Sequence, residues 1–143
     1  MNAVIDRIKF HLKKDKIRSK YIVFRKIITS VIYCSVLDSS CGDMTWMPSF
    51  LSSRSDVEYT GYDIVEANIN NHREKFRETD WKFEVHDIVT DPIKFSYDLI
   101  ISRHTTMHLA ISDAVKVIRN FADSSSKFLL TTSHPNTNVR FSY

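Results

Sequence analysis

Glycine, proline and cysteine are scarce in this sequence of 143 residues, which contains only two, three and two of them respectively. A protein built from many tight β-hairpins needs glycine and proline in its turns, so their scarcity disfavours an all-β sandwich. The two cysteines, Cys34 and Cys41, follow no paired pattern, and we therefore expect no disulfide scaffold. A reducing compartment, the cytoplasm, is the expected location.

Long apolar runs and metal-ligand patterns are also missing. The most apolar stretch, residues 21–37, contains Arg25 and Lys26 and is too charged to cross a membrane. The first residues lack the apolar segment of a secretory signal. Histidine, cysteine and acidic residues do not recur at the spacing of metal ligands, so no metal is expected. With 43% apolar and 26% charged residues, the composition is that of one globular domain.

Positive charge is concentrated near the amino end. Residues 1–26 hold nine lysines and arginines against two acids, a balance of +7, whereas the remainder of the chain has a balance of −4. Apolar residues recur every three or four positions over residues 2–33, which predicts a basic amphipathic helical arm over residues 1–30. We expect the arm to lie on the domain with its charged face in solvent. Contact with nucleic acid or a membrane surface is the alternative.

Residues 31–143 alternate between strand and helix patterns. Strands are expected at 33–38, 57–62, 81–86, 97–102 and 127–132, and helices at 45–53, 65–77 and 111–122. Thr45 and Ser112 are the expected caps of the first and last of these helices. Residues 88–96 are too few for a helical crossover. The order predicts an α/β fold, a Rossmann-like three-layer sandwich with a mostly parallel sheet of about five strands.

A loop of small residues follows the first expected strand. Asp38 ends that strand, and Ser39-Ser40-Cys41-Gly42 leads toward the next helix. A tight loop between a strand and a helix lets the backbone approach a nucleotide-like ligand closely. The next two strands also end in acids, Asp63 and Asp87. Because the carboxyl ends of parallel strands meet at one edge of the sheet, we expect the three carboxylates to line one site.

The order and spacing of these motifs resemble those of the class I S-adenosylmethionine-dependent methyltransferases, over about residues 30–133. The first motif of that family is a strand followed by acid-x-Gly-x-Gly-x-Gly, and the stretch from Asp38 to Met44 falls in its frame, with Gly42 as the central glycine. Ser40 and Met44 stand where the family has its other two glycines. We expect the Met44 side chain to hinder close contact between this loop and the cofactor.

The resemblance implies S-adenosyl-L-methionine as the cofactor and gives roles to individual residues. It implies that Asp63 binds the adenosine ribose, that Asp87 contacts the adenine amino group, and that Arg103 lies near the methionine part or the acceptor. The implied cofactor-binding set is Asp38, Ser40, Cys41, Gly42, Asp63, Ile64, Asp87, Ile88 and Arg103. His104 is the candidate catalytic residue, as a general base or as a group that orients the acceptor.

The implied activity is transfer of a methyl group to an acceptor that the sequence does not identify. An alternative is a non-catalytic binding or scaffold module of the same fold, favoured by Ser40 and Met44 and by the lack of a pattern for the family's last antiparallel strands before Tyr143. The chain would then be a truncated member whose fifth strand, 127–132, offers an open edge for self-association. A nicotinamide-dependent oxidoreductase is disfavoured because the G-x-G-x-x-G spacing is absent.

Overall fold

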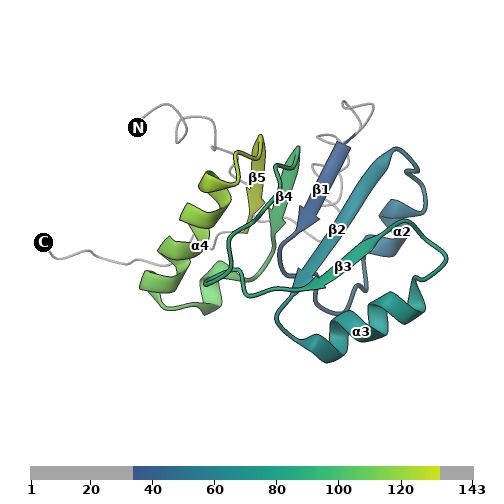
Figure 1. Ribbon diagram of the computed structural model, residues 1–143, viewed down its shortest axis with the longest axis horizontal. Helices are drawn as coiled ribbons and strands as arrows, with labels where there is room; N and C mark the ends of the chain where they lie inside the picture. The colour runs from purple at the N-terminus through teal and green to yellow at the C-terminus, as the bar shows by residue number, and fades with distance from the viewer. Residues whose placement is uncertain (1–33, 133–143) are drawn as a thin grey trace, which may run out of the picture.

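A computed structural model describes residues 34–132, and the predicted helical arm of residues 1–30 lies outside this range. The described part is a single sheet flanked by helices (Figure 1). Its strands are β1 (Cys34–Asp38), β2 (Val57–Asp63), β3 (Lys82–Val85), β4 (Leu99–Ser102) and β5 (Phe128–Thr131). Its helices are α2 (Met47–Leu51), α3 (Glu66–Lys75), the short 3-10 helix η2 (Thr106–His108) and α4 (Ile111–Asp123).

All five strands run parallel, in the order β3-β2-β1-β4-β5. β1 is central, because Val36 lies opposite Tyr59 of β2 on one side and Leu99 of β4 on the other. The chain moves outward from β1 to β3 and then returns to the other side at β4. In such a sheet the crevice at the carboxyl ends of β1 and β4 is where ligands bind. The predicted Rossmann-like architecture is confirmed.

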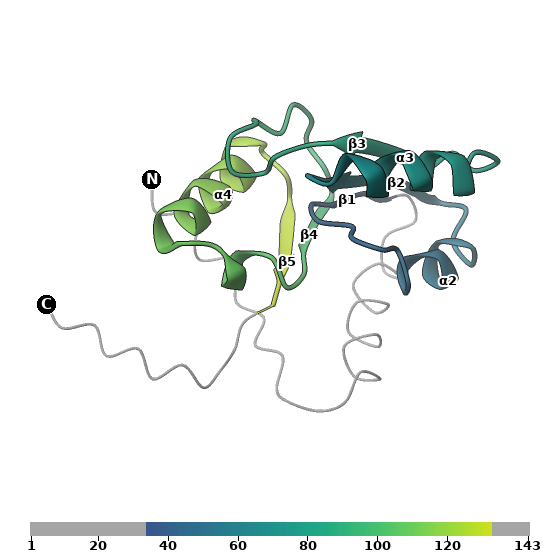
Figure 2. The same cartoon turned by 90° about the horizontal axis from the view of Figure 1, so that it is seen from below.

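Two apolar clusters fill the two faces of the sheet. One contains Val36 and Ile101 together with buried residues of α2 and α3. The other contains Leu37 and Ile100 together with Val117 of α4. Figure 2 accordingly shows α2 and α4 on opposite sides of the sheet. Val36 and Leu37 of β1 belong to different clusters, and so do successive residues of Leu99–Ile101 in β4, which explains why both runs are apolar without interruption.

The connection between β3 and β4 contains no helix, as its length predicts. Residues 86–98 form an irregular segment instead, and Ile88, Ile93 and Tyr97 of this segment are buried in the same cluster as α4. These side chains cover part of the sheet that a crossover helix would otherwise cover. The segment is therefore a packed part of the domain.

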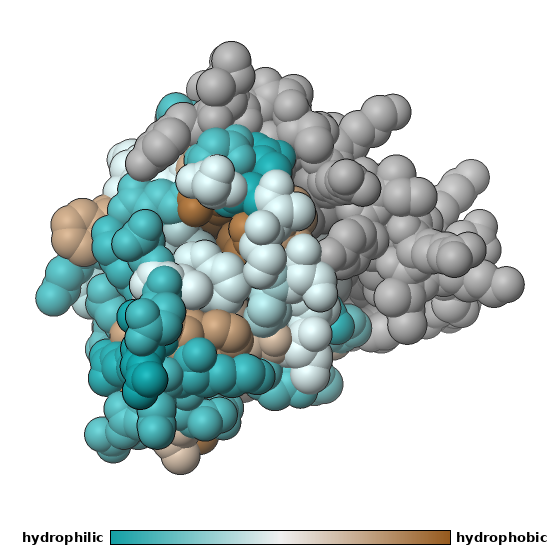
Figure 3. Space-filling view, turned by 90° about the vertical axis from the view of Figure 1, so that its right-hand side faces the viewer, coloured by the Kyte–Doolittle hydropathy of each residue, from teal (hydrophilic) through white to brown (hydrophobic). Residues whose placement is uncertain are grey.

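Helix α3 covers the outer strands and presents a polar surface to solvent. Ile69 and His72 are its buried residues. In Figure 3 the described surface is mainly hydrophilic, with apolar side chains between polar ones in the middle of the view and others protruding at its margins. α3 therefore packs on the sheet through few side chains and leaves most of its residues in solvent.

The helix starts differ from the predicted ones. α2 begins at Met47, with Trp46 and not Thr45 at the N-cap, and no side chain caps it. The Thr45 N–H instead donates to Asp43 Oδ1 at 3.1 Å, which fixes a turn just before the helix. α4 begins one residue before Ser112, with Ala110 at the N-cap. Both predicted caps were therefore wrong, because local turn bonds and packing set these boundaries.

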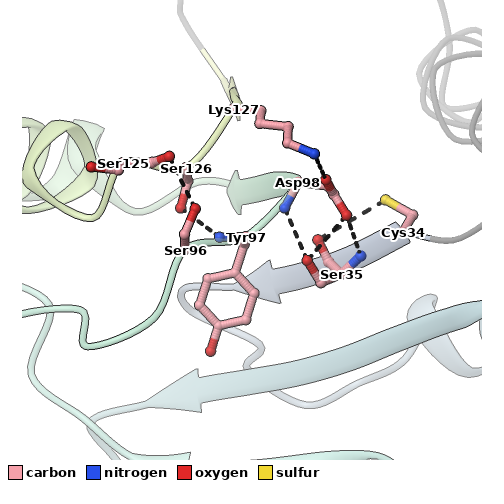
Figure 4. Close-up of polar contacts among 8 residues, drawn as sticks. All are labelled: Cys34, Ser35, Ser96, Tyr97, Asp98, Ser125, Ser126 and Lys127. Atoms are coloured by element: carbon pink, nitrogen blue, oxygen red, sulfur yellow. Dashed lines mark hydrogen bonds and ion pairs between the residues drawn. The ribbon is translucent and has the colours of Figure 1, made fainter.

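A polar cluster ties three strands together at the edge where they begin (Figure 4). Oδ2 of Asp98 accepts hydrogen bonds from the Ser35 N–H at 2.9 Å and the Ser35 hydroxyl at 3.2 Å. The other carboxylate oxygen accepts a hydrogen bond from Lys127 Nζ at 2.6 Å. Asp98 thus links the starts of β1, β4 and β5.

We expect Asp98→Ala to lower the free energy of unfolding by about 1–3 kcal/mol at pH 7, because it leaves the Ser35 N–H without its acceptor. The hydrogen bonds from Lys127 and from the Ser35 N–H lower the pKa of Asp98. A carboxyl with a lowered folded pKa stabilises the protein above its unfolded pKa, about 4, and this contribution is lost as the pH falls through the folded value. Urea unfolding of the wild type and of Asp98→Ala should therefore show that the difference between their free energies of unfolding becomes smaller from pH 7 to pH 3.

The control for this prediction is Lys116→Ala. Lys116 pairs with Asp113 at 2.8 Å, but both side chains are substantially exposed. Such a pair contributes about 0–1 kcal/mol. The proposed role of Asp98 would be contradicted if Asp98→Ala lowered the free energy of unfolding no more than Lys116→Ala does. It would also be contradicted if the loss of stability in Asp98→Ala did not depend on pH.

Candidate functional site

The predicted acids gather at the edge formed by the carboxyl ends of the strands. Asp38 and Asp63 are the last residues of β1 and β2, and their strands are paired, with Asp38 opposite Gly61. Asp63 lies opposite Val85, the last residue of β3, and Asp87 follows two residues later. Figure 1 shows the arrowheads of these strands at the same edge, beside the β1–α2 loop, residues 39–46.

Asp63 ties the β1–α2 loop to β2. Its Oδ2 accepts a hydrogen bond from the Gly42 N–H at 2.9 Å, and its Oδ1 accepts one from the Val65 N–H at 2.9 Å. A carboxylate offers about four acceptor positions, so two remain for a ligand's hydroxyl groups. The side chain is only partly buried. Asp63 can therefore shape the loop and bind a ligand at once.

Asp38 lies beneath the loop and not on its open side. The residue is 2% exposed, and its Oδ2 lies 3.4 Å from the Tyr59 hydroxyl, which donates to it. Burial raises the pKa of Asp38 to about 7, although hydrogen bonds from the Ser40 backbone and from Tyr59 oppose the rise. Asp38 thus changes its charge near neutral pH.

This raised pKa predicts how stability depends on pH. Between about pH 4 and pH 7 the folded protein holds a proton on Asp38 that the unfolded chain has lost. The contribution of Asp38 to the free energy of unfolding therefore falls as the pH rises through this range. We expect Asp38→Asn, which cannot titrate, to lose less stability than the wild type between pH 5 and pH 8 in urea unfolding. Asp43→Asn, at an exposed position, is the control. The prediction would be contradicted if the free energies of unfolding of Asp38→Asn and of the wild type changed equally with pH.

Met44 turns away from the open side of the loop. Its φ is +56°, a conformation that costs a residue other than glycine about 1–2 kcal/mol. The side chain is 1% exposed within the cluster beneath the loop, and its sulfur lies 3.1 Å from the Tyr59 hydroxyl. The side chain therefore does not project toward the open side, where the sequence suggested that it would hinder a ligand. The backbone keeps a conformation typical of glycine while the side chain fills the core.

Gly42 forms the open part of the loop. It also has a φ of +56°, and a Cβ added to it would meet no atom within 4 Å. Cys41 beside it contributes backbone only, because its side chain is buried and burial raises the pKa of the thiol to about 12. The Ser40 hydroxyl donates to the Ser39 carbonyl at 2.7 Å. The predicted loop residues are thus adjacent. Among them, Gly42 is the one that faces open space and has no side chain to keep a ligand away from the backbone.

The two isoleucines predicted at the site differ in exposure. Ile64 is 64% exposed next to Asp63, whereas Ile88 is buried in the cluster around α4. Ile88 therefore offers a ligand its backbone but little side-chain surface. Val85 was not predicted, yet it is 45% exposed and lies opposite Asp63 in the sheet. The sequence signal for Val85 was its position near the carboxyl end of the expected strand 81–86.

The other predicted residues lie after β4 and after β3. The Arg103 guanidinium lies 5.2 Å from the ring centre of Trp46, which brings the end of β4 to the start of α2. His104 is exposed, and its backbone N–H donates to Thr132 Oγ1 at 2.9 Å. Asp87 is partly exposed, and its Oδ1 accepts a hydrogen bond from the Val89 N–H at 2.9 Å.

A further contact at this loop was not predicted. Nε2 of His72, from α3, lies 2.6 Å from the Gly42 carbonyl oxygen. The sequence gives no signal of this partner 30 residues away. The loop is therefore held from α3 as well as from β2.

The described residues contain neither a metal-binding cluster nor a membrane-spanning helix. No group of three or more histidine, cysteine or acidic side chains among residues 34–132 could hold a metal ion. Within the same range no helix is both long and apolar enough to span a membrane.

Comparison with solved structures identifies the fold. TehB from Haemophilus influenzae is 25% identical, with a TM-score of 0.58, over 83% of this chain and 38% of that one. PH0226 from Pyrococcus horikoshii OT3 is 24% identical, with a TM-score of 0.62, over 90% and 65%. The N-methyltransferase NodS from Bradyrhizobium japonicum WM9, in complex with S-adenosyl-L-homocysteine, is 14% identical, with a TM-score of 0.62, over 75% and 55%. The chain thus spans between 38% and 65% of the length of these structures.

Comparison of sequences identifies the family. No curated protein matches the chain. Residues 37–126 match the family model described as a methyltransferase domain. This range includes the end of β1, the loop after it, Asp63 at the end of β2 and Asp87 just after β3. The chain therefore belongs to the methyltransferase-domain family and has the fold of the class I S-adenosylmethionine-dependent methyltransferases.

Proposed function

We propose that this chain binds S-adenosyl-L-methionine at the β1–α2 loop and transfers its methyl group to an acceptor. The observation that carries the proposal is the arrangement around Gly42. The residue combines a left-handed backbone with open space where a side chain would be, and the Asp63 carboxylate accepts its N–H. Such an arrangement suits an adenosyl ligand, whose ribose hydroxyls donate to a carboxylate while the loop backbone lies close to the ligand.

The surrounding residues suggest where the parts of the donor bind. Asp63 would accept the ribose hydroxyls, and the exposed Ile64 and Val85 beside it offer apolar surface to the adenine ring. Asp87 would accept from the adenine amino group. Arg103, with its guanidinium over Trp46, would bind the carboxylate of the methionine part. These assignments follow the family motifs and are supported by the gathering of the residues at one edge.

The chemistry needs little from the protein beyond positioning. When bound, the donor supplies a methyl group on a positively charged sulfur. An acceptor lone pair forms the new bond to carbon as the carbon–sulfur bond breaks, and its electrons return to sulfur. The acceptor must have lost its proton, and His104 is the proposed base because it is exposed at the carboxyl edge. Asp38 lies buried nearby and would favour a cationic ligand when ionised.

A non-catalytic module of the same fold is the second candidate. It is suggested by Ser40 and Met44, which stand at two glycine positions of the family's first motif. Such a module would keep the loop and the strand-ending acids and would bind the donor without turnover.

Two measurements test the proposal. Isothermal titration of the full chain with S-adenosylmethionine and with S-adenosylhomocysteine should show saturable binding, and NADH, as a control ligand, should show none. No saturable heat at millimolar donor would refute the proposed site. Incubation of the full chain with donor carrying a labelled methyl group and a cell extract then separates the two candidates. Transfer of label supports the enzyme, whereas donor binding without transfer supports the module.

A further inference from the structure

The backbone of Gly42 is held on both sides by side chains from other elements. Its N–H donates to Asp63 Oδ2 at the end of β2, and its carbonyl oxygen accepts from His72 Nε2 of α3. These partners lie 21 and 30 residues from Gly42 in the sequence. The only glycine that the loop keeps from the family motif therefore has both of its polar backbone groups bound to side chains.

His72 is built into its position. The residue is 2% exposed, and its ring lies 5.3 Å from the ring of Phe83 and 6.1 Å from that of Phe76, measured between centroids. A carbonyl oxygen can only accept, so Nε2 must carry the proton in this hydrogen bond. Nδ1 is buried and has no hydrogen-bond partner in the described part of the chain. Contact with Gly42 is thus the one polar contact found for this ring among residues 34–132.

The loop needs anchors of this kind. Met44 adopts a left-handed conformation although it is not a glycine, which costs about 1–2 kcal/mol. Ser40 and Met44 also restrict the backbone more than glycines would. A loop with such a conformation persists only where the surrounding structure fixes it. Asp63 fixes the peptide before Gly42, and His72 fixes the peptide after it.

We propose that His72 is a positioning residue for methyl-donor binding, which holds the Gly42 peptide in the conformation that accepts the donor. This inference rests on the proposed function, because it assumes that the loop binds S-adenosylmethionine. His72 takes no part in the transfer itself. Loss of its hydrogen bond raises the dissociation constant and the KM of the donor and leaves kcat at saturating donor unchanged.

Two variants separate the hydrogen bond from the packing of the ring. His72→Phe keeps an aromatic ring beside Phe83 and removes the donor, whereas His72→Gln keeps an N–H donor at similar reach. Isothermal titration of the full chain with S-adenosylmethionine should show about tenfold weaker binding for His72→Phe and near wild-type binding for His72→Gln. Phe121→Leu, in the cluster on the other face of the sheet, controls for lost stability.

A readout without ligand separates this proposal from the proposed function. Hydrogen exchange of the Gly42 N–H in the free protein should be about tenfold faster in His72→Phe, and unchanged in His72→Gln and Phe121→Leu. If the wild type binds no donor, the proposed function fails, and the exchange result alone decides whether His72 holds the loop. The proposal is overturned if His72→Phe leaves either the exchange rate of the Gly42 N–H or the affinity for the donor unchanged. It is also overturned if both His72 variants lose the same donor affinity.

Discussion

Replacing Asp63 by alanine is expected to weaken binding of S-adenosylmethionine by about ten- to a hundredfold. The carboxylate accepts the Gly42 N–H and the Val65 N–H, each at 2.9 Å, and in the proposed site it also accepts the ribose hydroxyls. Hydrogen bonds to a charged group each contribute about 1.5–3 kcal/mol, and each 1.4 kcal/mol is tenfold in affinity. The variant loses both the loop anchor and the ligand contact, which is why the expected effect is large.

Isothermal titration of the full chain measures this effect. Asp63→Asn retains one acceptor oxygen and should lie between the wild type and the alanine variant. Asp80→Ala is the matched control, because it removes an exposed acid between α3 and β3. Unchanged affinity in Asp63→Ala would mean that the donor binds elsewhere.

Replacing Tyr59 by alanine is expected to lower the free energy of unfolding by about 3–5 kcal/mol, the usual cost of removing a buried aromatic side chain. Tyr59 is 0% exposed, and its ring makes edge contacts with Trp81 and Phe83 at 6.2 Å and 5.9 Å between centroids. Its hydroxyl also lies within 3.4 Å of Asp38 and 3.1 Å of the Met44 sulfur. One side chain therefore supports both the core and the loop above it.

Urea unfolding separates these two contributions. Tyr59→Phe keeps the ring and removes the hydroxyl, and we expect it to cost only about 1 kcal/mol. Phe95→Ala removes an aromatic ring that is 62% exposed, and it should change stability by less than about 0.5 kcal/mol. Equal losses in Tyr59→Phe and Tyr59→Ala would show that the hydroxyl, and not the packing of the ring, provides most of the stabilisation.

The features of the fold that could be predicted were those encoded by local patterns. β4 is buried on both faces and is therefore apolar at Leu99, Ile100 and Ile101, a run that the sequence shows directly. The irregular link before it followed from its length. Helix starts could not be predicted in the same way, because the turn at Asp43 is a single hydrogen bond that no periodicity encodes.

The candidate site was predictable as a set of strand ends but not as a set of contacts. The position of Asp63 at the end of β2 follows from the alternation of strands and helices, which brings it to the edge beside the loop. The direction of the Met44 side chain depends on the space beneath the loop, which is made by Tyr59 and other distant residues. The contact between His72 and Gly42 joins an ordinary helix position to a backbone atom, and such pairs leave no mark in a single sequence.

The double anchoring of Gly42 has a consequence for protein engineering. The conformation of the β1–α2 loop is specified outside the loop, by one residue at the end of β2 and one on α3. A transplant of residues 39–46 into another parallel-sheet scaffold would carry the recognition sequence without the groups that shape it. The smallest portable unit is instead the continuous segment from Cys34 to Val85, which contains β1, α2, β2, α3 and β3. It includes both anchors and the rings of Phe76 and Phe83, which pack against His72.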